Sequence, residues 1–161
     1  MRFILLALAL MAIVPISAAS AEPAKTYHPK ATPYDREADS MAEVDAALAR
    51  AQETDKRVVV VMGGNWCHDS RGLAFWFSRP RFAAMLDEKY EVVYVDVGQR
   101  DRNIDIAQRF GIESLKGTPT VLVLSSQGLL LNRESAPTWR NAASRTGKDI
   151  FLYFNRFTPE T

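Results

Sequence analysis

Apolar positions along the chain follow two kinds of pattern. Met41, Val44, Leu48 and Ala51 recur every three or four residues, which predicts a helix with one buried face. Residues 58–62 form a valine run that ends in methionine, and a run without polar alternation is typical of a strand covered on both faces. The same patterns, followed to the end of the chain, predict helices over 40–57, 67–77, 78–86, 103–110 and 138–157, and strands over 58–62, 91–97, 120–124 and 129–131. Gly147 is a point at which the last helix can be divided in two.

The order of these elements predicts an α/β fold. A helical crossover separates the first two strands, so they should be parallel neighbours. The turn at residues 125–128 should make the last two strands an antiparallel hairpin. We therefore expect a mixed four-stranded sheet with helices on both faces, in which strand 58–62 lies between strands 91–97 and 120–124.

The first 21 residues have the pattern of a secretory signal peptide. Arg2 provides a positive start, and the apolar run over residues 3–14 is too short to span a bilayer. Pro15 breaks the run, and residues 19–21 offer small side chains for cleavage. An uncleaved N-terminal anchor is the alternative. We expect residues 1–21 to be removed, residues 22–38 to form an extended, proline-containing linker, and residues 39–161 to form one folded domain.

Composition narrows the classes of function. Removal of residues 1–21 takes Arg2 and no acid from a chain with 20 basic and 19 acidic residues, which leaves a neutral protein. No basic block with interleaved aromatic residues points to nucleic acid, and no second apolar run is long enough to span a membrane. We expect export, most simply to a periplasm. Disulfides persist in such a place, yet the single Cys67 cannot form one within the chain, so its thiol is either buried and inert or exposed and reactive.

Cys67 lies where chemistry is expected. Residues 64–70, Gly-Asn-Trp-Cys-His-Asp-Ser, come directly after the buried strand and begin a helix. This order places the sulfur beside the free backbone N–H groups of a helix N-terminus, which stabilise negative charge. Because the thiolate is the nucleophilic form of cysteine, the position favours a reactive thiol.

At these residues the chain resembles the thioredoxin superfamily, whose signature is Trp-Cys-x-x-Cys between a strand and a helix. Trp66 and Cys67 match, and Ser70 stands in place of the second cysteine. Residues 116–120, Lys-Gly-Thr-Pro-Thr, are similar to the family's cis-proline loop. The resemblance covers about residues 40–157. It implies a thioredoxin-like fold, a cis bond between Thr118 and Pro119, and that this loop lies against Cys67.

Two departures from the family concern one chemical step. Ser70 cannot expel a partner from a mixed disulfide, so release must wait for an external thiol, although a serine hydroxyl can donate a hydrogen bond to the Cys67 thiolate. Thioredoxins also carry a buried acid six residues before the first cysteine, and here that position is Val61. Both losses favour a one-thiol function over dithiol reduction.

Other side chains of the motif have assignable roles. We expect Cys67 and Ser70 to be catalytic, and Trp66, His68, Thr118 and Pro119 to contact substrate. A His68 imidazolium would favour the thiolate, and the alternative is an exposed polar turn residue. No metal site is expected from Cys67, His68 and Asp69, because structural zinc takes four ligands and the only other histidine, His28, lies in the linker. No cofactor is expected.

Two functions stay open at this point. The first is a monothiol exchange protein outside the cytoplasm, related to thiol–disulfide oxidoreductases or isomerases, in which Cys67 attacks protein or small-molecule disulfides. In this case the Thr118 backbone would pair with an extended substrate. The second is a non-catalytic binding or adaptor module, in which Cys67 is a relic or links two subunits through a disulfide.

Overall fold

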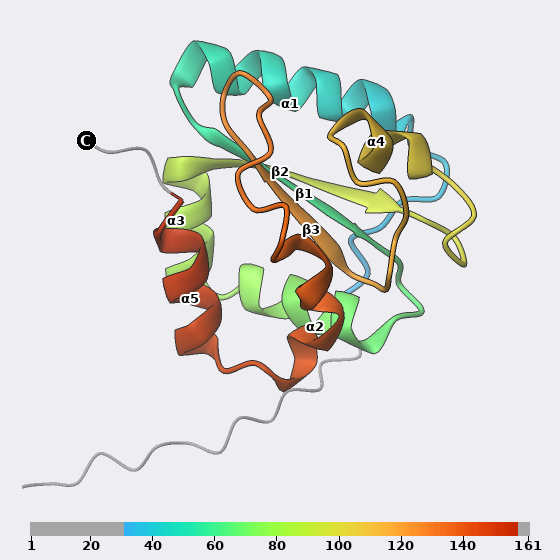
Figure 1. Ribbon diagram of the computed structural model, residues 1–161. Coiled ribbons are helices and arrows are strands. Elements are labelled where there is room, and N and C mark those ends of the chain that lie inside the picture. Colours follow the sequence, from blue (N-terminus) through green and yellow to red (C-terminus); the bar gives the residue numbers. More distant parts are fainter. Residues whose placement is uncertain (1–30, 158–161) are drawn as a thin grey trace, which may run out of the picture.

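A computed structural model describes residues 31–157 of the chain (Figure 1). The expected signal peptide and the first part of the expected linker, residues 22–30, lie outside the described residues. The helices and strands of the described part are α1 (Ser40–Thr54), β1 (Arg57–Gly63), α2 (His68–Phe77), α3 (Pro80–Lys89), β2 (Tyr90–Asp96), α4 (Ile104–Arg109), β3 (Thr120–Leu124), the 3₁₀ helix η1 (Ala136–Ser144) and α5 (Gly147–Asn155).

The described strands form one mixed sheet in the order β2-β1-β3. β1 runs parallel to β2, with Val61 opposite Tyr94, and antiparallel to β3, with Met62 opposite Thr120. The central position of β1 and the directions of both neighbours confirm the prediction from the valine run. A strand with two partners and helices above and below it has no solvent face, which is why every residue of β1 after the first is buried.

The prediction of a fourth strand is wrong. After β3 the chain makes a single bridge, between Leu124 and Leu130, and then leaves the sheet. The buried side chain of Asn132 takes over the outer edge of β3: its Oδ1 accepts from Val123 N at 2.8 Å, and its Nδ2 donates to Val121 O at 2.8 Å. A side-chain amide presents the same donor and acceptor as a peptide group, so the edge is satisfied without another strand.

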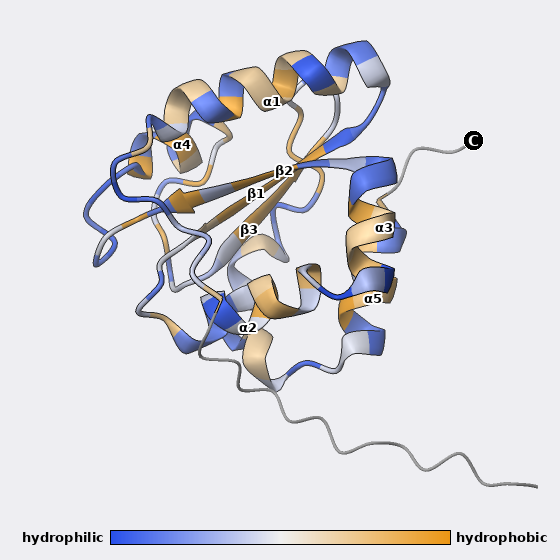
Figure 2. Cartoon of the chain, turned by 180° about the vertical axis from the view of Figure 1, so that it is seen from behind, coloured by the Kyte–Doolittle hydropathy of each residue, from blue (hydrophilic) through white to orange (hydrophobic). Residues whose placement is uncertain are grey.

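Helices cover both faces of the sheet, as predicted. α1 and α4 lie on one face, and α2, α3, η1 and α5 on the other (Figures 1 and 2). β1 divides its side chains between them: Val58, Val60 and Met62 enter the core under α1, and Val59 and Val61 enter the core on the α2 side. None of the helices within residues 31–157 has both the length and the apolar content to cross a bilayer.

The two ends of the domain differ in how well the sequence pattern describes them. Residues 31–38, expected as linker, contain no helix or strand, but Tyr34 is buried in the α2-side core, so the folded part begins earlier than its sequence pattern indicates. The helical stretch expected over residues 138–157, with a possible break at Gly147, is divided into η1 and α5, and α5 begins at Gly147. Thr146 separates the two helices and caps α5, because its hydroxyl accepts from Asp149 N.

Candidate functional site

Antiparallel pairing brings the two halves of the site together. Cys67 follows the last residue of β1, and Pro119 precedes the first residue of β3. Because the two strands are antiparallel, both residues lie at the same end of the strands. The Thr118–Pro119 peptide bond is cis. The Cys67 sulfur donates a hydrogen bond to the Thr118 carbonyl at 3.3 Å. The expectation that this loop lies against Cys67 is therefore met, across 51 positions of sequence.

Cys67 is the N-cap residue of α2. Its backbone N–H donates to Gly64 O, and its carbonyl accepts from Arg71 N, which closes the turn and begins the helix. No side chain caps this N-terminus, so the N–H groups of the first turn are left for the sulfur or for a bound partner. The residue is only 8% exposed. The thiol is thus largely covered, and it lies at a helix N-terminus that no side chain caps.

The residues that replace the second cysteine and the acid lie beneath Cys67. Ser70 is completely buried in the first turn of α2, and its hydroxyl has no hydrogen-bond partner among the described residues. The expected bond from Ser70 to the Cys67 sulfur is therefore not formed in this state, in which the thiol donates to Thr118. Val61 is buried on the α2 side of β1 and brings no polar atom to this place.

Trp66 and Asn65 connect the motif to distant segments. The Trp66 ring is 48% exposed, and its Nε1 donates to Gly98 O at 2.7 Å, which places the loop after β2 beside the motif. Asn65 accepts from Tyr34 N and donates to Tyr34 O, so one amide side chain holds the backbone of the N-terminal segment. The motif is therefore tied to two segments outside it, the loop after β2 and the N-terminal segment that carries Tyr34.

His68 and Asp69 are the first two residues of α2. His68 is exposed at the first residue of α2. The Asp69 carboxylate accepts from Ala143 N at 2.8 Å and so joins α2 to η1. Among residues 31–157 no group of three histidine, cysteine or acidic side chains is arranged to hold a metal ion.

Tyr34 and Asp96 are two neighbours of the site that sequence reasoning missed. Burial raises the pKa of Tyr34 well above its usual value; Tyr94 adds to the rise, Ser70 partly opposes it, and Cys67 and Asp96 contribute smaller increases. Asp96 ends β2 opposite Gly63, where it accepts from Gly98 N and lies 3.8 Å from Arg102. The only sequence signal for Asp96 was a charged residue at the end of a buried strand, and for Tyr34 there was none.

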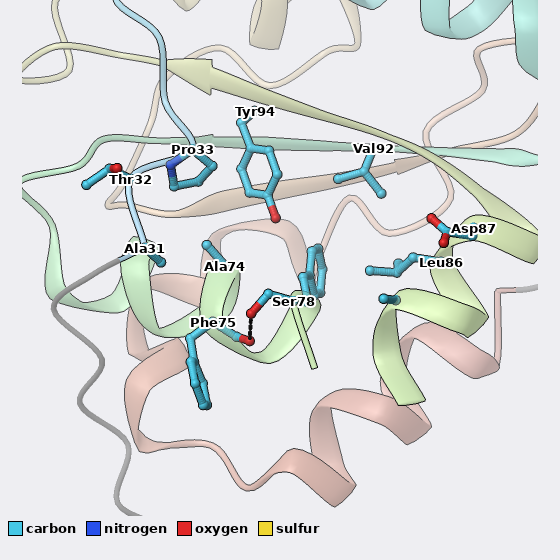
Figure 3. Close-up of a pocket in the computed structure, with 12 residues that line it drawn as sticks. Ala31, Thr32, Pro33, Ala74, Phe75, Ser78, Leu86, Asp87, Val92 and Tyr94 are labelled. Atoms are coloured by element: carbon cyan, nitrogen blue, oxygen red, sulfur yellow. Dashed lines mark hydrogen bonds between the residues drawn. The ribbon is translucent and has the colours of Figure 1, made fainter. Parts of the chain in front are cut away.

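An apolar groove of the described chain is separate from this site. A groove of about 860 Å³ lies between α2, α3, β2 and residues 31–33, and the Tyr94 ring extends from β2 into it (Figure 3). The groove is not lined by the residues of the candidate site, which are Trp66, Cys67, Ser70 and Thr118. The candidate chemistry around Cys67 therefore does not belong to this groove.

Comparison with known proteins agrees with this geometry. Residues 39–126 match the thioredoxin-like family. The crystal structure of a disulphide isomerase from Xylella fastidiosa Temecula1 is similar, with 32% sequence identity and a TM-score of 0.73 over 79% of this chain and 97% of that chain. A protein of unknown function from Pseudomonas aeruginosa matches with 18% identity and a TM-score of 0.39 over 74% of this chain and 86% of that one. No curated protein matches the chain.

Proposed function

The chain belongs to the thioredoxin-like family, and from this premise we propose that it is a monothiol thiol–disulfide exchange protein acting outside the cytoplasm. The observation that carries the proposal is the position of Cys67, at the uncapped N-terminus of α2 and 3.3 Å from the Thr118 carbonyl. The resemblance to a bacterial disulphide isomerase points to the same chemistry.

The reaction follows from the chemistry of one thiol. The Cys67 thiolate attacks one sulfur of a partner's disulfide, a new S–S bond forms to Cys67, and the other partner sulfur leaves as a thiolate that takes up a proton. Because exchange replaces one S–S bond by another, no outside oxidant is needed. An external small thiol then attacks the mixed disulfide, restores Cys67 and becomes disulfide-linked to the partner sulfur.

Substrate contact is assigned to the residues around the sulfur. Thr118 and Pro119 enter β3, so an extended partner segment can pair with their backbone as a short added strand. Trp66, which is half exposed, provides apolar area next to the sulfur, and His68 lies at the exposed helix start. The partners are thus protein or small-molecule thiols and disulfides, in a periplasmic protein that begins at Glu22 after cleavage. Detection of Met1 in the mature exported protein by intact mass would contradict this start.

The lifetime of the mixed disulfide tests the function. In wild-type protein loaded with a small disulfide, we expect the adduct on Cys67 to persist and to decay at a rate proportional to added thiol. Ser70→Cys places a second thiol three residues along the same helix, where it can form an internal disulfide and expel the partner. The variant should therefore lose its adduct without added thiol. Intact mass measured over time gives both lifetimes.

Ser78→Cys is the matched control. It makes the same change at the other end of α2, eleven residues from Cys67, and a helix rises about 1.5 Å per residue, so the two sulfurs are too far apart to meet within one molecule. Equal adduct lifetimes in Ser70→Cys and Ser78→Cys would refute intramolecular resolution. Failure of wild-type Cys67 to form any adduct would favour the second candidate, a thioredoxin-fold adaptor, which the burial of Cys67 supports.

A further inference from the structure

Two buried hydroxyl groups meet beneath the first turn of α2. Tyr34 is 3% exposed and Ser70 is 0% exposed, and neither hydroxyl oxygen has a hydrogen-bond partner of normal geometry among the described residues. Both lie at one point: a Cβ on Gly63 would be 2.4 Å from Ser70 Oγ and 2.7 Å from Tyr34 Oη. Buried hydroxyls are seldom left without a partner, so this pair calls for an explanation.

Tyr34 is held firmly in this place. The Asn65 amide binds its backbone N–H and carbonyl, and its ring packs edge-on against Tyr94 with 5.4 Å between the ring centres. Asn65 belongs to the turn that leads into Cys67, so the tyrosine and the thiol are fixed to the same short segment. The N-terminal segment is therefore part of the support of the thiol.

The Tyr34 hydroxyl is suited to donate. Its raised pKa keeps it protonated far above neutral pH, and the Ser70 hydroxyl is close enough to act on that pKa. Ser70 follows Cys67 by three residues, a spacing that places side chains on one side of a helix. Val61 supplies no carboxylate in this layer of the core.

We propose that Tyr34 is a positioning residue for Cys67: its hydroxyl donates to Ser70 Oγ, which turns the Ser70 proton toward the Cys67 sulfur once that sulfur is ionised. In the thiol form the sulfur donates its hydrogen bond to Thr118 O and does not need a hydrogen bond from Ser70. A thiolate can only accept, and a charged acceptor strengthens each bond in the chain behind it. No covalent bond forms and no proton is transferred between the two hydroxyls. They only rotate to new hydrogen-bond partners. The inference rests on the proposed function for its purpose.

Alkylation of Cys67 by iodoacetamide tests the proposal, because it reports thiolate reactivity and needs neither a disulfide nor a partner. At pH 7 we expect Ser70→Ala to lower the alkylation rate about tenfold, because it removes a direct hydrogen bond to the charged sulfur. We expect Tyr34→Phe to lower the rate about threefold, because it removes a bond that supports Ser70 and acts on the sulfur only indirectly. Both deficits should vanish at a pH high enough to ionise the thiol in every variant. A merely structural defect would persist at all pH values.

Two comparisons make the result decisive. Tyr94→Phe removes the hydroxyl of a neighbouring, half-buried tyrosine that faces the apolar groove, and it should alkylate like wild type. In the Ser70→Ala background, Tyr34→Phe should have no further effect, because the chain of hydrogen bonds is already broken. Additive effects, or a Tyr34→Phe rate equal to that of Tyr94→Phe, would overturn the proposal.

The test is independent of the proposed function. If Cys67 is alkylated with the expected dependence on Tyr34 but forms no mixed disulfide, the exchange function fails and the positioning role stands. If mixed disulfides form normally and Tyr34→Phe is silent, the reverse holds.

Discussion

Asn132 gives the sharpest prediction about stability, because its side-chain amide hydrogen-bonds the backbone along the outer edge of β3. Replacement by alanine removes the acceptor of Val123 N–H and the donor to Val121 O, and both backbone groups lie in a fully buried strand. It also removes a 2.8 Å bond to Tyr153 Oη, although that hydroxyl keeps its contact with Ser135 Oγ. Two backbone groups are then left buried and unpaired.

The expected cost can be worked out from these contacts. Each buried polar group left without a partner costs about 1–3 kcal/mol, so the loss of two partners in Asn132→Ala should lower the free energy of unfolding by about 2–6 kcal/mol. For a domain of this size that corresponds to a fall in thermal midpoint of roughly 10 °C. Urea titration followed by circular dichroism measures the free energy directly, with the slope against urea checked for constancy.

Asn141→Ala is the control for this change. Asn141 is exposed, and its Oδ1 accepts only from Arg145 Nε at 3.0 Å among the bonds found. The same substitution should change stability there by no more than about 0.5 kcal/mol. If Asn132→Ala also stays within 1 kcal/mol of wild type, roughly the lower bound for one orphaned group, the argument that its amide replaces a strand is refuted.

Two further predictions concern the buried hydroxyls. Gly63→Ala forces its new methyl against the hydroxyls of Tyr34 and Ser70 and should destabilise the protein by about 1–3 kcal/mol in urea, whereas unchanged stability would mean that both side chains move freely. Burial raises the pKa of Tyr34, Tyr90 and Tyr94 above the usual 10.0, so the stability that they contribute is complete below pH 10 and is lost as the pH rises further. Urea titrations at pH 8.5 and 10.5 should show that the free energy of unfolding falls. Each tyrosine contributes at most about 1.4 kcal/mol for each pH unit. An equal free energy of unfolding at the two pH values would contradict the burial of the three tyrosines.

Much of the framework follows from the sequence, because it depends on local patterns. The valine run of residues 58–62 can only be a strand covered on both faces, and it is the central strand. The helical spacing from Met41 to Ala51 lies within α1. The Trp-Cys motif follows a buried strand directly, so its place at a helix N-terminus was settled by chain order. Each of these inferences uses neighbours within about one turn or one strand.

The features that sequence reasoning missed depend on contacts between distant segments. Tyr34 stands in a proline-containing stretch without apolar period, and only the fold shows that Asn65 and Tyr94 hold it in the core. The fourth strand was expected from an apolar run after a turn, but strand pairing needs a partner edge, and Asn132 had already satisfied that edge with its side chain.

The state of the thiol was likewise decided by tertiary structure. Spacing placed Ser70 near Cys67, but the direction of a hydroxyl depends on which acceptor the packed structure offers it. The antiparallel pairing of β1 and β3 brings the Thr118 carbonyl to the sulfur, and the thiol donates there. Ser70 is left facing Gly63 and Tyr34, because the bare backbone of a glycine leaves room for two hydroxyls from segments that are far apart in the sequence.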